Sequence, residues 1–204
     1  MISISNIEKD DQYKQRLKLE IQGQKIRNLE SVQLFTNLKY LNCSNNQISD
    51  FAPISELKLE ILVADFNFIR QLRPLQNMNS LEVLSLTMNE LELAEVLELF
   101  PLPNLQNLTI FDNPAMKSPT FFSEILISLP NLKFLNDEKV RNDEGELEDL
   151  EKFVSELEDA GEDVFVEKWL PERAFCIYES PDTEQMLQQI DIDIKVKLQQ
   201  LGLK

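Results

Sequence analysis

The residue types that carry most enzyme chemistry are absent or scattered in this sequence. Histidine, the commonest general base and the base of the usual serine and cysteine triads, does not occur in the 204 residues. The four glycines lie far apart, so no glycine-rich loop could cradle a phosphate. Asp and Glu number 36, but no two of them stand out as an acid and its base. We therefore expect a protein that is not an enzyme and that uses no cofactor.

The two cysteines also lack the spacing that metal binding or redox chemistry requires. Cys43 falls at an inward position of an expected strand, and Cys176 lies far away in the sequence, with no CxxC pair. We expect both to be reduced thiols in the core, with no disulfide and no metal ligand role.

Asparagine is the polar residue that does recur in register. Asn46, Asn67, Asn89 and Asn113 each follow the same apolar pattern. A buried amide can both donate and accept hydrogen bonds, whereas an unpaired buried polar group costs about 1 to 3 kcal/mol. The four asparagines are therefore predicted to stack as a ladder that satisfies backbone groups of neighbouring turns, and Gln24 interrupts it at the N-terminal side.

The apolar pattern before each asparagine shows which elements position it. It has the form LxxLxL, with starts at Leu38, Leu59, Leu81, Leu105 and Leu132 and spacings of 21, 22, 24 and 27 residues, and a degenerate copy begins at Arg16. The sequence resembles an array of leucine-rich repeats. This resemblance implies an α/β solenoid with a parallel β-sheet on its concave face. Short return segments in the first three repeats are consistent with 3₁₀ turns or irregular backbone behind that sheet.

Two later return segments have helical spacing instead. The apolar residues between 93 and 100 predict a helix of two turns that ends near Pro101. A second helix is expected between Pro119 and Pro130, and its apolar face consists of Phe121, Phe122, Ile125, Leu126 and Leu129.

Three segments are expected along the chain. Residues 1–15 are predicted to form an N-terminal cap, and residues 16–140 the repeats with a C-terminal cap. Residues 141–204 are predicted to form an acidic amphipathic extension of helical or mixed structure, in which 183–201 fits a helix better than a strand. Much of the net charge of −16 lies between 137 and 163, with 13 acidic and 3 basic residues.

The stretch 112–140 carries a more specific resemblance. It contains Asn113-Pro114, a helix ending at Leu129-Pro130, and the run 132–136. These features resemble the C-terminal cap of the family that includes the acidic leucine-rich nuclear phosphoproteins, the spliceosomal leucine-rich A-prime protein and the axonemal dynein leucine-rich light chain. Asn136 stands where that family usually has Asp. The 22-residue repeats themselves resemble those of the phosphatase-regulating leucine-rich subunit.

Outward side chains of the expected strands form the candidate binding site. They are expected in three rows across the strands, and the third row includes Ser44, Asp65 and Phe111. The apolar members are predicted to form one contiguous surface on a face that should meet water, and such a patch usually marks a binding site. These apolar members are Tyr40, Ile61, Val63, Val83, Phe111 and Phe134. Two alternatives stay open: the C-terminal segment could fold over this face, or the β-branched residues could serve strand propensity alone. The candidate partner-binding residues are Tyr40, Asn42, Ile61, Val63, Asp65, Val83, Ser85, Thr109, Phe111 and Phe134.

These observations favour an intracellular interaction module, an adaptor or complex subunit whose concave face binds a helix or extended segment of a larger protein. The alternative is an acidic regulator or chaperone that engages a basic client protein through its acidic segment. A chain this acidic without a basic cluster predicts no nucleic-acid partner. No apolar stretch suggests a signal peptide or a membrane partner, which predicts a cytoplasmic location, cilium or cytoskeleton included, or a nuclear one.

Overall fold

The computed structural model describes residues 14–99, 102–142 and 145–147. The expected N-terminal cap at 1–15 and the expected extension at 141–204 lie almost entirely outside these residues. The helix or strand expected at 183–201 and the position of Cys176 also lie outside them.

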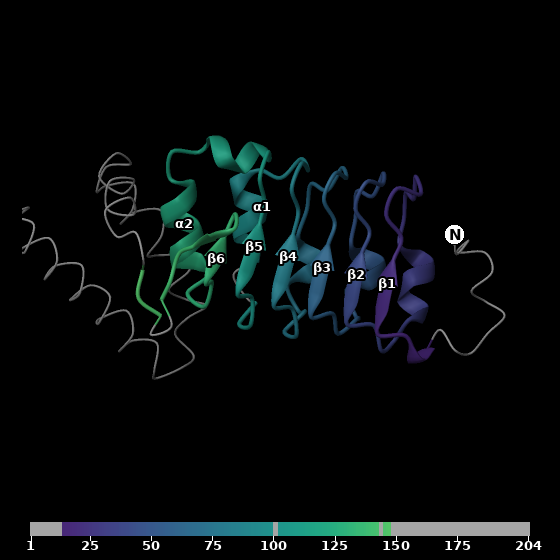
Figure 1. Ribbon diagram of the computed structural model, residues 1–204. Helices are drawn as coiled ribbons and strands as arrows, with labels where there is room; N and C mark the ends of the chain where they lie inside the picture. Colours follow the sequence, from purple (N-terminus) through teal and green to yellow (C-terminus); the bar gives the residue numbers. More distant parts are fainter. Residues whose placement is uncertain (1–13, 100–101, 143–144, 148–204) are drawn as a thin grey trace, which may run out of the picture. The chain divides into compact units, whose positions relative to one another are not determined.

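A seven-stranded sheet forms one layer of the described part (Figure 1), with its strands in chain order. Strands β1 to β6 pair in parallel, and β7 is antiparallel to β6. The strands are short because each repeat supplies only two or three residues before the chain turns. Their bounds are β1 (Lys18–Glu20), β2 (Tyr40–Asn42), β3 (Ile61–Val63), β4 (Val83–Ser85), β5 (Asn107–Thr109), β6 (Phe134–Leu135) and β7 (Glu138–Lys139).

The return segments form the second layer. The first three contain the expected 3₁₀ turns, η3 (Glu30–Leu34), η4 (Ala52–Ile54) and η5 (Arg73–Leu75). The two expected helices are present as α1 (Leu93–Leu97) and α2 (Phe121–Ser128), with η6 (Pro114–Lys117) before the second. Helix α1 is shorter than the two turns predicted. Phe100, the last apolar residue of the predicted helix, lies outside the described residues.

The hydrophobic core lies between the two layers, and the repeat leucines fill it. Leu41, Leu62, Leu84 and Leu108 are fully buried at the central inward position of successive strands. Cys43 is a free, buried thiol, and burial raises its pKa to about 12. The predicted core role of Cys43 is thereby confirmed.

The predicted asparagine ladder is confirmed, and Asn67 shows its geometry. The Asn67 Oδ1 accepts a hydrogen bond from the Ile48 N–H at 3.0 Å, in the preceding repeat. Its Nδ2 donates to the Cys43 and Ala64 carbonyl oxygens, both at 3.1 Å. Asn46, Asn89 and Asn113 are also buried and bond both ways across repeats.

Asn136 adds a buried amide beyond the predicted four. Its Oδ1 accepts a hydrogen bond from the Ile110 N–H at 2.7 Å. Since this contact needs only an acceptor oxygen, an Asp could make it equally well. The hydrogen bond to Ile110 therefore does not distinguish Asn from Asp at this position.

Replacing Asn67 with Ala should destabilise the protein by about 1 to 3 kcal/mol, because the substitution leaves buried backbone donors and acceptors unpaired. The matched control is Asn77→Ala, since the Asn77 side chain is exposed and makes no hydrogen bond within the described part. A denaturant titration of both variants measures the difference. Equal, small losses at both positions would contradict the ladder's structural role.

Candidate functional site on the open face of the sheet

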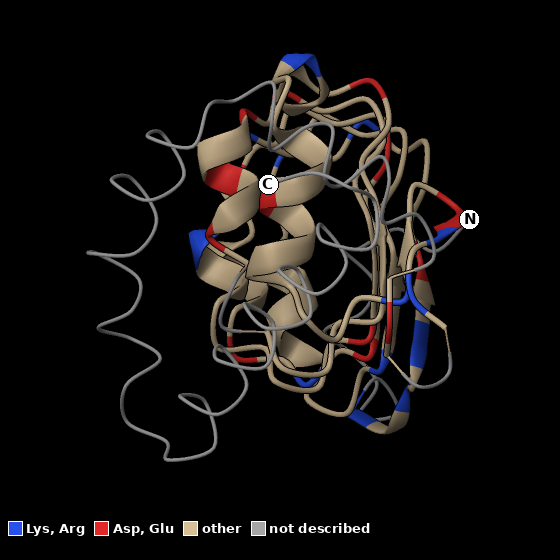
Figure 2. Ribbon diagram, turned by 90° about the vertical axis from the view of Figure 1, so that its left-hand side faces the viewer, with Lys and Arg blue, Asp and Glu red and all other residues tan. Residues whose placement is uncertain are grey.

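The two faces of the sheet differ in what covers them. Figure 2, which looks along the row of strands, shows the helices and turns gathered on one side of the sheet. No other element among the described residues packs on the opposite side, which we call the open face. Side chains at alternate strand positions point to this face, because successive side chains of a strand alternate.

The ten candidate residues are brought together on the open face in the predicted rows. Register pairs place Tyr40, Ile61 and Val83 side by side, with Asn107 and then Phe134 beyond them. The second row holds Asn42, Val63, Ser85 and Thr109. The third row lies just after the strands and includes Asp65 and Phe111. Its neighbouring position Ser44 is buried, although an outward side chain was expected there.

The apolar part of these rows is smaller than predicted. Tyr40, Ile61, Val63 and Val83 are half-exposed and adjacent, and we call these four residues the strand patch. The polar Asn107 separates Val83 from Phe134, so Phe134 does not extend the patch. The expected continuous apolar surface is therefore divided in two.

Charged side chains border the strand patch and pair with one another. The Lys18 ammonium lies 4.8 Å from the centroid of the Tyr40 ring and forms an ion pair with Glu20 at 2.9 Å. The hydrogen bond to Glu20 raises the pKa of Lys18. Lys39 pairs with Glu60 at 2.7 Å. These cations are thus already matched by carboxylates of the same chain.

Sequence reasoning missed an apolar rim beside the strand patch. The rim consists of Phe66, Phe68, Met88 and Phe111, which are 48%, 50%, 46% and 37% exposed. The Phe66 N–H bonds the Thr87 oxygen and the Met88 N–H bonds the Phe111 oxygen, both at 2.8 Å. Phe111 lies in the third row of the open face and, as an exposed neighbour of Met88, is also part of this rim.

Two rim residues hold an unfavourable backbone conformation. The residue before each ladder asparagine has a positive φ, and so does Gly23 (φ 69°) before Gln24. Glycine adopts this conformation at little cost, and Asn45 (58°) and Asp112 (54°) belong to the residue types that tolerate it best after glycine. Phe66 (56°) and Met88 (53°) occupy the equivalent positions, where a bulky side chain costs of order 1 kcal/mol. In the sequence, Phe66 and Met88 stand where other repeats have Gly, Asn or Asp, and this difference could have located the rim.

Asp65 lies between the strand patch and the rim, and its carboxylate is fixed by neighbouring repeats. One oxygen, Oδ1, accepts hydrogen bonds from the Ser85 hydroxyl at 2.7 Å and from the Thr87 N–H at 2.8 Å. The Asp65 N–H in turn bonds the Ser44 hydroxyl at 3.2 Å. No hydrogen bond to the other oxygen, Oδ2, and no ion pair of Asp65 occurs within the described residues.

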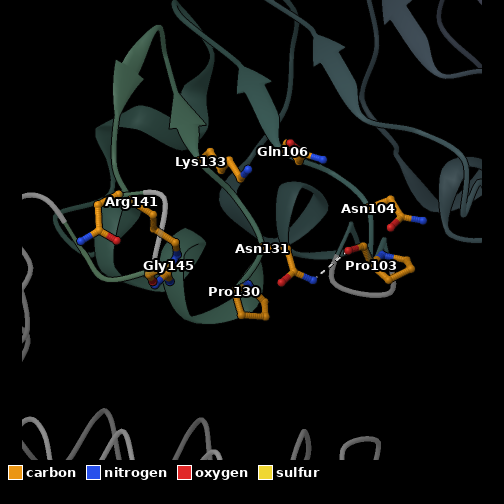
Figure 3. Close-up of a pocket in the computed structure, with 9 residues that line it drawn as sticks. Pro103, Asn104, Gln106, Pro130, Asn131, Lys133, Arg141 and Gly145 are labelled. Carbon is orange, nitrogen blue, oxygen red and sulfur yellow. Dashed lines mark hydrogen bonds between the residues drawn. The ribbon is translucent and has the colours of Figure 1, made fainter.

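A separate hollow lies at the opposite edge of the sheet, where β5 and β6 begin (Figure 3). It has a volume of about 330 Å³. Asn131 donates to the Pro103 oxygen at 2.8 Å, and Arg141 donates to the Gly145 and Leu126 oxygens. Burial lowers the pKa of Arg141. Because these bonds tie the chain after β7 to α2, we assign Arg141 a structural role.

The described residues contain no group of three or more His, Cys, Asp or Glu side chains that could hold a metal ion. None of the helices described is long and apolar enough to cross a membrane. Most of the acidic segment at 144–163 lies outside the described residues, so the open face is the site that the structure defines.

The fold is a leucine-rich repeat solenoid of mixed α/β class, with a mostly parallel sheet. No family model matches the sequence. The chain is similar to a chain of the Drosophila melanogaster SNF/U2A′ complex, with a TM-score of 0.54 and 19% identity over 92% of this chain and 98% of that one. At this identity the likeness shows the fold alone.

Other similarities cover less of the proteins compared. Two internalins of Listeria monocytogenes, inlF and inlC2, give TM-scores of 0.44 and 0.42 at 22% and 20% identity, covering 61% and 71% of this chain and 48% and 79% of theirs. The uncharacterized protein F09G8.5 of Caenorhabditis elegans is 34% identical over 108 residues. This match takes in 51% of the present chain but only 23% of the nematode protein's length.

Proposed function

We propose that this protein is a non-catalytic interaction module of the cell interior, an adaptor or complex subunit, whose open face binds a helix or extended segment of a larger protein. The observation that carries the proposal is the strand patch. Its four half-exposed apolar side chains lie on a sheet face that no other described element covers. The centre of such a patch supplies most of the binding energy once water is excluded.

The structure of similar fold from Drosophila melanogaster supports the proposal of an interaction module, since it is a chain of a complex named for two proteins, SNF and U2A′. The likeness does not identify a partner for the present chain. Our proposal extends to it only the general role of a leucine-rich repeat module within an assembly.

The rival function is an acidic regulator or chaperone of basic clients, and the salt dependence of binding separates the two. We expect partners captured from a cell extract and identified by mass spectrometry to remain bound when the salt concentration is raised from about 50 to about 300 mM. An apolar contact that excludes water is only weakly screened by salt. Neutralising Glu144, Glu146, Glu148 and Glu151 together should leave capture unchanged. Loss of capture in that variant, with steep loss in salt, would favour the chaperone.

A further inference from the structure

We propose that Asp65 selects the partner segment by binding one basic side chain, with the strand patch and the rim holding apolar side chains of the same segment on either side. This inference rests on the proposed function and specifies the chemistry of its partner. The occupant is therefore a peptide segment in which a single Lys or Arg is flanked by apolar residues.

The local structure needs only a neutral hydrogen-bond acceptor at the position of Asp65. The backbone N–H groups of Ser44, Asp65 and Thr87, which follow three successive strands, each donate to a side-chain oxygen. Asn42 Oδ1 accepts from the Ser44 N–H at 3.1 Å, and the Ser44 hydroxyl accepts from the Asp65 N–H at 3.2 Å. Asp65 Oδ1 accepts from the Thr87 N–H at 2.8 Å. Amide and hydroxyl oxygens perform the task in two repeats, so the charge of Asp65 is not required for it.

The other oxygen of Asp65, Oδ2, has no partner among the described residues. Since Oδ1 takes two hydrogen bonds, the carboxylate is oriented before any ligand arrives, and little rotamer freedom is left to lose. Lys18, Lys39 and Arg70 form ion pairs with glutamates, not with Asp65. Oδ2 therefore offers a charge-assisted hydrogen bond to an external cation.

Apolar residues precede and follow Asp65 in the chain. Val63 of the strand patch precedes it by two residues, and the exposed Phe66 and Phe68 of the rim follow it. When apolar side chains cover these neighbours, water around Asp65 is excluded and its interaction with a cation is strengthened. An anionic partner is disfavoured, both by Asp65 and by the net charge of −16.

The test is the selection of binders from a phage-displayed library of random 16-residue peptides on the full chain. We expect enriched peptides to share one Lys or Arg at a fixed spacing from apolar residues. Asp65→Asn, which supplies an amide oxygen in place of Oδ1 for Ser85 and Thr87, should weaken the binding of these peptides about tenfold. Asp50→Asn is the matched control, because Asp50 Oδ1 likewise accepts a backbone N–H, that of Ala52 at 2.9 Å, in an exposed turn. It should change nothing.

A double-mutant cycle assigns the contact. Replacing the shared basic residue of a selected peptide by Gln should weaken binding to the original protein about tenfold but add no loss on Asp65→Asn. Peptides that need Ile61 but lack a basic residue, or that ignore Asp65→Asn, would overturn this inference and leave the proposed function standing. Peptides that bind Ile61→Arg normally would contradict the proposed function. Enrichment of no peptide would contradict the inference, since a face that recognises a short segment should select one.

Discussion

A chain cut after Pro101 should lose cooperative folding, although it keeps four of the strands. The cut removes the repeat whose Leu105, Leu108 and Ile110 cover the core behind β4, and also the cap residues Leu129, Leu132 and Leu135, all of which are buried. Fully burying one such side chain stabilises a protein by about 1.5 to 3 kcal/mol, and total stability is commonly about 5 to 15 kcal/mol. Losing six such side chains is therefore comparable with the whole stability of the protein, so the shortened chain should not fold cooperatively.

The shortened chain is also expected to aggregate, because its last repeat would present the leucines at 84, 86 and 91 to water. The control is a chain cut after Leu147, which retains every buried residue that the structure describes. Thermal unfolding followed by circular dichroism should show a cooperative transition only for the longer chain. A soluble shorter chain with a cooperative transition would show that the core closes before β5.

Much of the solenoid could be predicted because its inward positions are dictated by burial. The LxxLxL period placed the strands, and the period therefore also fixed which outward residues would be neighbours, such as Tyr40, Ile61 and Val83. The ladder was predictable because a buried asparagine in register needs partners in the adjacent turns. These features depend on the pattern of each repeat alone.

The composition of the open face was harder to predict, because the repeat pattern says little about outward residues. The predicted rows of outward side chains already place Asn107 between Val83 and Phe134. How far Asn107 divides the apolar surface depends on the exposed area of each side chain. The role of Asp65 depends on hydrogen bonds to Ser85 and Thr87 in the next repeat. No single repeat contains that information.

The rim was missed for a different reason. Outward position was inferred from strand alternation, and Phe66 and Met88 lie in the turns after the strands, where alternation no longer applies. Both residues have a positive φ in those turns and are 48% and 46% exposed. The strain of a bulky residue there is an observation from which a functional role can be argued.

Ile61→Arg should reduce affinity for the captured partner by at least about 100-fold, equivalent to about 2.7 kcal/mol. Ile61 lies between Tyr40 and Val83 in the strand patch, so the substitution places a guanidinium in a contact that excludes water. Burying such a charge without a counter-charge costs several kcal/mol. The isoleucine is only half-exposed in the free protein, and an arginine can extend toward solvent there, so the fold should persist.

The most direct test of the open face as the binding site is the dissociation constant of that partner for three proteins: the unmodified chain, Ile61→Arg and Leu34→Arg. Leu34 is a half-exposed leucine in η3, in the layer behind the sheet, so its replacement adds the same charge away from the open face. We predict a loss of at least about 100-fold for Ile61→Arg and less than about threefold for Leu34→Arg, with both variants folded. Unchanged affinity in a folded Ile61→Arg variant would contradict the account.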